Sequence, residues 1–114
     1  MSLIYKIVTA PEWRAATTTG VFHGAAIDLH DGFIHFSTAE QARETAAKHF
    51  AGQDDLLLVA VDPARLADAL KWEVSRGGAL FPHLYAPLSF DDVTHVAPLP
   101  LAADGAHDFA GLLE

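Results

Sequence analysis

The chain has 114 residues and a mass of 12.2 kDa, which is typical of one folded domain with one core. Hydrophobic residues make up 51% of it and charged residues 19%, a composition that excludes a disordered chain. Seven Lys and Arg against 15 Asp and Glu give a formal charge of −8, so we expect no nucleic-acid partner. The lack of cysteine excludes disulfides, thiolate catalysis and Cys-ligated metal centres.

No segment of the sequence has the pattern of a membrane span or a secretion signal. The longest apolar run, Leu56–Val61, is about a third of the length that a span needs. The N-terminus enters the apolar stretch Leu3–Tyr5 without a basic region and a long hydrophobic segment. Because repeats and linkers are also lacking, we expect one cytoplasmic domain over residues 1–114, with no membrane partner.

The first part of the chain predicts a strand, a helix and a loop. Leu3–Val8 is apolar on both alternating faces and predicts a largely buried strand. Thr9–Glu12 supplies a capping hydroxyl, a proline and a carboxylate, which predict a short helix that ends by Gly20. Residues 20–32 carry three glycines and no sustained period, and they predict a shaped loop.

The middle of the chain predicts a strand, a longer helix and a central strand. Phe33–Phe36 reads as a short strand that leads into Ser37–Glu40, an S-x-x-E capping box at the start of a helix. Gly52 lies just beyond the expected end of that helix. Leu56–Val61 shows no alternation and predicts a strand that is buried on both faces, followed by a helical turn at Asp62-Pro63.

The last part of the chain predicts a hairpin, a further strand and a final helix. Leu70–Ser75 and Ala79–Tyr85 flank Gly77-Gly78, which predicts a hairpin with a two-residue turn. Asp92–Ala97 predicts another strand and Asp104–Leu113 a frayed helix. This order of elements predicts the α+β class, with a mixed or antiparallel sheet and flanking helices.

The first candidate site is the junction His35-Phe36-Ser37, at the end of a strand and the start of a helix. A helix N-terminus favours anions, so His35 and Ser37 could contact a phosphate oxygen or a ribose hydroxyl. The simpler alternative is that Ser37 only caps the helix and His35 is a structural strand histidine.

The second candidate site is the predicted hairpin. A two-residue turn would place Val74 opposite Phe81, Trp72 opposite His83 and Leu70 opposite Tyr85.

That register would gather an imidazole, a phenol and an indole on one face, with the carboxylate of Glu73 on the other. Aromatic and titratable groups line small-molecule pockets. The alternative is that Trp72 and Phe81 are ordinary core residues and that Glu73 is solvated.

The third candidate site is the set His23, Asp28, His30 and Asp31 in the expected loop. These residue types suit Zn²⁺, Ni²⁺ or Fe²⁺, but no His-x-His, His-x₃-His or HExxH spacing fixes a geometry. An ordinary surface loop is the alternative, and we expect no bound metal.

Several blocks of the sequence resemble the uncharacterised bacterial family known as domain of unknown function 952. The resemblance rests on Ile4–Ile7, Trp13, Asp31–Gln41, Leu56–Asp62, Trp72-Glu73 and Phe81–Leu88. It covers about residues 3 to 98 and leaves 99–114 as a C-terminal tail. This family is similar in turn to the ADP-ribosyltransferase fold, with a layout closest to the RNA 2′-phosphotransferases.

The resemblance implies a split sheet of the ADP-ribosyltransferase type and roles for individual residues. His35 matches the strand histidine that contacts the ADP-ribose moiety. Lys6 stands where the family of transferases has a histidine, and Ile7 where it has a glycine, which favours binding over catalysis. Glu73 or a residue near His83 would polarise the ribose 2′-hydroxyl.

We therefore expect binding or processing of NAD or an ADP-ribose-like nucleotide, with NAD as a possible substrate and no required cofactor. The expected catalytic residues are Glu73, His83 and His35, and the expected ligand-binding residues are Lys6, Ser37, Trp72 and Tyr85. The alternatives are a non-catalytic small-molecule binding module and a metal-dependent hydrolase that uses the loop histidines.

Overall fold

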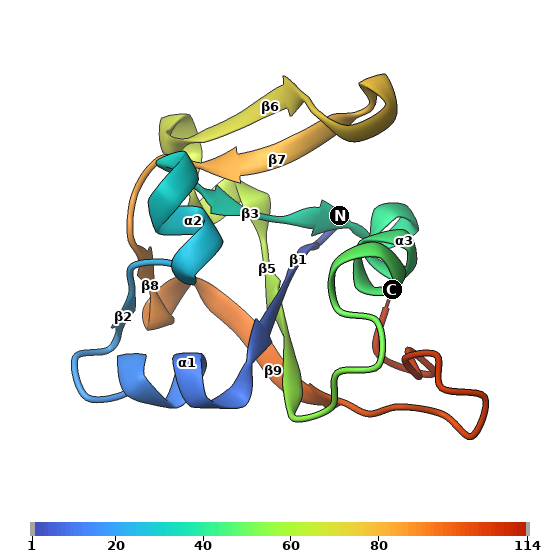
Figure 1. Cartoon of the computed structure of the whole chain (residues 1–114). Coiled ribbons are helices and arrows are strands. Elements are labelled where there is room, and N and C mark those ends of the chain that lie inside the picture. The colour runs from blue at the N-terminus through green and yellow to red at the C-terminus, as the bar shows by residue number, and fades with distance from the viewer. Residues whose placement is uncertain (1, 114) are drawn as a thin grey trace.

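A four-stranded antiparallel sheet, in the order β4-β1-β5-β9, forms the centre of the computed structural model, which describes residues 2–113 (Figure 1). Its strands are β1 (Ile4–Thr9), β4 (Ser37–Thr38), β5 (Leu56–Val61) and β9 (Val93–Leu99). Strand β5 has the predicted bounds and lies between β1 and β9, and its two faces contribute to the two hydrophobic clusters, as its continuous apolar sequence requires.

Two smaller sheets complete the fold. Strands β3 (Ile34–His35), β7 (Leu80–Leu84) and β6 (Leu70–Val74) form one, and β2 (Val21–Phe22) pairs with β8 (Leu88–Ser89) in the other. Every strand pair in residues 2–113 is antiparallel, so the fold is α+β with the antiparallel form of the predicted sheet. Besides the α-helices described below, the chain forms short 3₁₀ segments at Pro63–Arg65, Ala67–Ala69, Arg76–Gly78 and Phe90–Asp92.

Helix α1 (Ala10–Ala16) begins as predicted. The Thr9 hydroxyl accepts a hydrogen bond from the backbone N–H of Glu12 at 3.3 Å and donates one to the Glu12 carboxylate at 2.7 Å. The helix ends at Ala16 rather than near Gly20.

The loop prediction for residues 20–32 was wrong, because this segment contains β2 and helix α2 (Ala26–Asp31). A helix of six residues is too short to show a hydrophobic period. It begins where the Asp28 carboxylate accepts a hydrogen bond from Ala25 N–H at 2.8 Å. It ends at Gly32, whose φ of 88° is readily adopted only by glycine.

The predicted strand Phe33–Phe36 is reduced to Ile34–His35, and a second short strand, Ser37–Thr38, follows it in the central sheet. Ile34 and His35 pair with β7, whereas Ser37 pairs with Tyr5 of β1. Between them, Phe36 N–H donates to the Pro82 carbonyl at 3.0 Å.

Helix α3 (Ala39–His49) begins one residue later than the predicted capping box implies. Thr38 is the N-cap: its hydroxyl accepts from Gln41 N–H at 3.2 Å, and the Gln41 side chain accepts from Thr38 N–H at 3.1 Å. Ser37 does not cap, because its backbone belongs to β4; its hydroxyl is 2.9 Å from that of Thr45.

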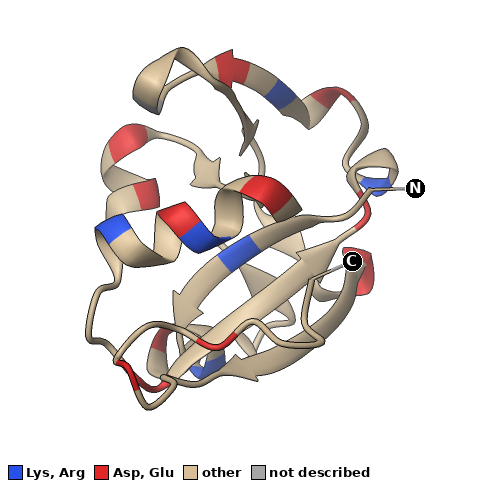
Figure 2. Cartoon of the chain, turned by 90° about the vertical axis from the view of Figure 1, so that its right-hand side faces the viewer, with Lys and Arg blue, Asp and Glu red and all other residues tan. Residues whose placement is uncertain are grey.

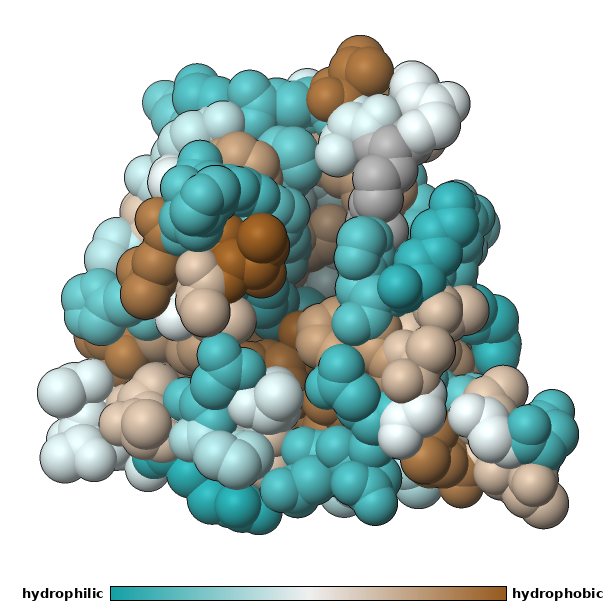
Figure 3. Space-filling view, in the orientation of Figure 1, coloured by the Kyte–Doolittle hydropathy of each residue, from teal (hydrophilic) through white to brown (hydrophobic). Residues whose placement is uncertain are grey.

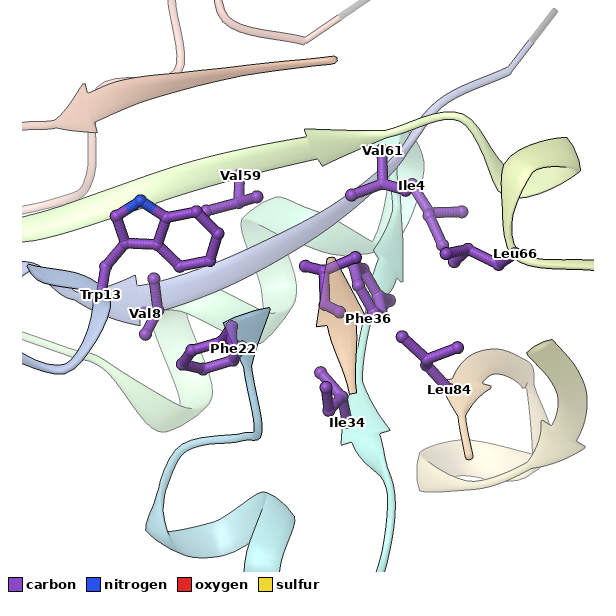
Figure 4. Close-up of a cluster of buried hydrophobic side chains, with 11 residues drawn as sticks. Ile4, Val8, Trp13, Phe22, Ile34, Phe36, Val59, Val61, Leu66 and Leu84 are labelled. Atoms are coloured by element: carbon purple, nitrogen blue, oxygen red, sulfur yellow. The ribbon is translucent and has the colours of Figure 1, made fainter. Parts of the chain in front are cut away.

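Two hydrophobic clusters cover the two faces of the central sheet. Ile4, Val8 and Val61 point to one face, where they meet residues of α1, β3 and β7 (Figure 4). Tyr5 and Ile7 point to the other face, where α3 and the C-terminal segment pack.

The helix predicted over Asp104–Leu113 is absent: residues 100–113 form turns with one bridge between Leu101 and His107. Gly105 and Gly111 have φ values of 85° and 74°, which interrupt a helix. Phe109 nevertheless anchors this segment in the core.

The charged residues are not gathered by sign on one face. Figure 2 shows Lys and Arg scattered among the more numerous Asp and Glu positions. Within residues 2–113 no helix is both long enough and apolar enough to cross a membrane.

Candidate functional site

The face of the β3-β7-β6 sheet that points away from the core carries two histidines. His35 lies directly opposite His83 in the register of β3 and β7, and their ring centroids are 5.7 Å apart. Phe33 packs against both rings, with centroid distances of 4.5 Å to His35 and 4.0 Å to His83. Alternation along each strand explains this arrangement, because the neighbouring Ile34 and Leu84 enter the core.

Glu73 and Tyr85 belong to the same cluster. One carboxylate oxygen of Glu73 accepts hydrogen bonds from His83 Nδ1 at 2.8 Å and from the Tyr85 hydroxyl at 2.6 Å. The bond from Tyr85 and then that from His83 lower the pKa of Glu73 below its usual value. The same bond to Glu73 raises the pKa of Tyr85. The pair therefore holds a carboxylate and a neutral phenol at neutral pH.

The hairpin is present, but the predicted register was wrong by one residue. Glu73 pairs with Phe81, Trp72 with Pro82 and Lys71 with His83.

The cause is the turn, which spans residues 75–79 instead of two glycines. Ser75 N–H donates to the Ala79 carbonyl at 2.9 Å, and Gly78 N–H donates to the Ser75 carbonyl at 3.0 Å. This shift puts Glu73, rather than Trp72, on the face of His83 and Tyr85.

Asp28 connects His35 to Lys6 beneath helix α2. One oxygen of its carboxylate accepts from Lys6 Nζ at 2.8 Å, from His35 Nδ1 at 2.6 Å and from His35 N–H at 3.1 Å. The other oxygen is 2.8 Å from Lys6 Nζ and accepts from Ala25 N–H. The side chains of Lys6 and Asp28 are only 5% and 1% exposed, so water does not share these bonds.

The charges of this network depend on one another. Burial favours the neutral form of Asp28, but the bond from His35 and the charge of Lys6 outweigh it and lower the pKa of Asp28 to about 2. Burial lowers the pKa of Lys6, and the neighbouring Asp28 opposes that shift. Asp28 is thus a carboxylate that only accepts hydrogen bonds, and it directs the Nδ1–H of His35 toward itself.

A cavity of about 450 Å³ lies between α2 and α3, beside the edge of β1 that β4 leaves uncovered after Tyr5. Figure 3 shows the surface hollowed between these two helices. Its lining combines a few polar groups with apolar walls, as small-molecule sites do. The lining residues with polar side chains are Tyr5, Lys6, Asp31, His35, Ser37, Thr45, His49 and Ser75.

A larger hollow of about 740 Å³ lies elsewhere, between the start of β1, the start of α3 and the 62–64 turn. The ionisable side chains that line it are two carboxylates, Glu40 and Asp62. We place the candidate site in the smaller cavity, because residues with a cation, a carboxylate, two imidazoles and four hydroxyls line it.

The structure separates the residues that the sequence grouped as one site. Lys6, His35 and Ser37 line the 450 Å³ cavity. His83, Glu73 and Tyr85 form the cluster beside His35, and Phe33 joins the two sets. Trp72 lies apart from both, 46% exposed, in the wall of the 740 Å³ hollow.

Sequence reasoning missed the role of Asp28, which it assigned to a metal-binding loop. The available signal was Lys6, because a lysine within a buried apolar strand requires a buried partner. Thr45 and His49, on α3, also line the cavity, but nothing in the sequence around them indicated a role in the site.

The suggested metal ligands are not arranged as a metal site. Asp28 is committed to Lys6 and His35, while His30 Nδ1 is 3.0 Å from an oxygen of Asp31. Among residues 2–113, no group of three or more His, Asp or Glu side chains has the geometry to hold a metal ion. The hydrolase alternative therefore has no metal site in this part of the chain.

The sequence assigns the chain to a known family. The chain belongs to the family described as "Protein of unknown function (DUF952)", which it matches over residues 7–96. The matched region includes Asp28, His35, Glu73 and His83, whereas Lys6 lies just before it.

Among solved structures, the chain is similar to protein CC0527 from Caulobacter crescentus. The crystal structure of that protein is 56% identical in sequence, with a TM-score of 0.90 over 95% of each chain. Its solution NMR structure gives a TM-score of 0.87 over 97% of this chain and 96% of that one. No curated protein matches the chain.

Proposed function

We propose that the chain binds a small nucleotide-like ligand, of the NAD or ADP-ribose class, in the cavity between α2 and α3. The observation that carries this proposal is His35, an imidazole held by a buried carboxylate at the wall of a cavity of suitable size. Ser37 and Thr45 add hydroxyls, and Ile27 and Phe50 add apolar surface for a base or a nicotinamide ring.

The arrangement of the sheets supports an ADP-ribosyltransferase-like architecture. The four-stranded and three-stranded sheets part where the chain crosses from β3 to β4, and the cavity lies beside that crossing. His35 is in β3 and Lys6 in β1, the two positions at which the resemblance places ligand contacts.

A non-catalytic binding module is the second candidate, and Lys6 favours it. Its ammonium group is bonded to Asp28 at 2.8 Å and is buried, so it is not available as an acceptor or a proton carrier for a substrate. Glu73 is likewise engaged by His83 and Tyr85. We therefore propose binding as the primary activity and NAD turnover as a separate question.

The test of binding is calorimetry with NAD, ADP-ribose, AMP and nicotinamide. We expect at least one nucleotide to bind wild type and the affinity to fall about tenfold or more in His35→Gln, the loss expected for a bond to a charged group. Trp72→Phe is the matched control, because Trp72 lies outside the cavity. Failure of all four ligands to bind, or equal affinity in His35→Gln, would overturn the proposal.

The test of turnover is single-turnover release of nicotinamide. Release that falls about 100-fold in Glu73→Gln with unchanged NAD affinity would assign Glu73 to transition-state stabilisation. Binding without release by wild type would establish the binding module.

A further inference from the structure

Both ring nitrogens of His35 lie against carboxylates, and the two carboxylates differ in their surroundings. Nδ1 is 2.6 Å from Asp28, whose side chain is buried and has further donors. Nε2 is 2.9 Å from Oδ2 of Asp31, which lines the cavity and is 34% exposed. The other oxygen of Asp31 contacts His30, which is almost fully exposed. Asp28 is thus the buried partner of His35, whereas Asp31 is its partly exposed partner.

These bonds define what the ring offers to the cavity. An ionised carboxylate has no proton to donate, so the ring nitrogen in each of these contacts is the donor. One N–H is directed to Asp28, and the other nitrogen faces Asp31 and the cavity. Whatever replaces Asp31 at Nε2 must be a hydrogen-bond acceptor, and an anionic oxygen gives the strongest such bond.

The position of Asp31 in α2 is unfavourable for the helix itself. Asp31 is the last residue of the helix, where unpaired carbonyl groups repel a carboxylate. Its contacts to His30 and His35 offset this repulsion. The contact to His35 lies at the wall of the cavity, which both residues line.

We propose that, in the ligand-free protein, the Asp31 carboxylate occupies the position at Nε2 of His35 that an anionic oxygen of the ligand takes on binding. When a ligand enters, its phosphate or carboxylate oxygen takes the bond to Nε2, and the side chain of Asp31 turns outward to solvent. With both ring nitrogens of His35 protonated, the charges of Lys6, His35, Asp28 and Asp31 cancel while Asp31 is in place, and one positive charge faces the ligand when Asp31 turns outward. The cavity thus selects ligands with an anionic oxygen over neutral nucleosides. This inference rests on the proposed function only for the location of the ligand.

The test compares Asp31→Asn and Asp31→Ala with wild type, with Asp54→Asn as the control. Asp54 is an exposed carboxylate on the loop before β5 and does not line the cavity, so its loss changes net charge equally. We expect both Asp31 variants to bind AMP and ADP-ribose about two- to fivefold more tightly, the range for releasing a partly exposed ion pair. Adenosine affinity should stay constant, and Asp54→Asn should match wild type.

A second measurement separates displacement from simple charge repulsion. The ¹⁵N resonance of His35 Nε2 should shift in ligand-free Asp31→Ala, because its hydrogen bond is lost. In wild type it should shift on addition of AMP. An unchanged Nε2 resonance in Asp31→Ala, or weaker AMP binding by both Asp31 variants, would overturn the inference.

The two proposals fail separately. If nucleotides do not bind, inorganic phosphate and acetate remain as probes, and either should move the Nε2 resonance at lower concentration in Asp31→Asn than in wild type. That result would retain the anion site and reject the nucleotide. ADP-ribose binding that is insensitive to Asp31 would retain the proposed function and reject the role of Asp31.

Discussion

Lys6 and Asp28 form an ion pair of 2.8 Å in which neither side chain is more than 5% exposed. The partners come from β1 and α2, 22 residues apart in the sequence. A buried charge without its partner is strongly unfavourable, so this pair makes the position of α2 depend on β1.

Asp28→Asn should lower the free energy of unfolding by about 3–5 kcal/mol, because it leaves the buried ammonium of Lys6 without a counter-charge. Urea denaturation measures the change. Asp55→Asn is the matched control: its partner Arg14 is 3.8 Å away and both side chains are exposed, so the loss should be below about 1 kcal/mol. The double variant Lys6→Met/Asp28→Leu should recover much of the stability. If Asp28→Asn and Asp55→Asn lowered the free energy of unfolding equally, the buried ion pair would not contribute to stability as predicted.

The same pair predicts a dependence on acid. The pKa of Asp28 in the folded protein, about 2, is below its ordinary value of 3.8, so its contribution is complete above about pH 4 and is lost as pH falls toward 2. The pKa difference corresponds to about 2 kcal/mol. Between pH 5 and pH 2.5, wild type should lose roughly 1.5 kcal/mol more stability than Lys6→Met/Asp28→Leu does, because part of the contribution remains at pH 2.5. Parallel losses in urea denaturation of the two proteins would contradict the lowered pKa.

Gly24→Ala should displace Asp28. Gly24 has a φ of 126°, and a Cβ built on it would lie 2.8 Å from Cβ of Asp28. Gly20→Ala is the control, because its φ of 76° is also positive but no atom lies within 4 Å of its Cβ position. We expect Gly20→Ala to lower stability by about 1–2 kcal/mol and Gly24→Ala by about 1–3 kcal/mol more. The His35 Nδ1 resonance should shift in Gly24→Ala alone; a shift in both variants would attribute the effect to backbone strain.

Thr38→Ala and Ser37→Ala should differ in how they destabilise α3. Thr38→Ala removes the N-cap and should lower stability by about 1 kcal/mol, with faster hydrogen exchange at the Gln41 amide. Ser37→Ala removes the bond to Thr45, at a comparable loss in stability, but leaves Gln41 protected. Faster exchange at Gln41 in Ser37→Ala would restore the original assignment of Ser37 as the cap.

Local sequence signals predicted those elements whose determinants are close together in the chain. The N-cap of α1 at Thr9, the strand β5 and the existence of the β6–β7 hairpin each depend on a few adjacent residues. The same reasoning failed for α2, which is too short to show a period and is held by the long-range contacts of Asp28.

Three features of the site were decided only by tertiary structure. Pairing of Ser37 with β1 made Thr38 the cap of α3, and a turn over residues 75–79 moved Glu73 to the face of His83. Asp28 was predicted as a loop residue, yet it accepts bonds from Lys6 and His35 in a buried network. The sequence by itself determined which chemical groups are present and that most strands are apolar. Only packing decided which charged groups come into contact. A buried charged group requires a partner, and here the partners lie far apart in the chain.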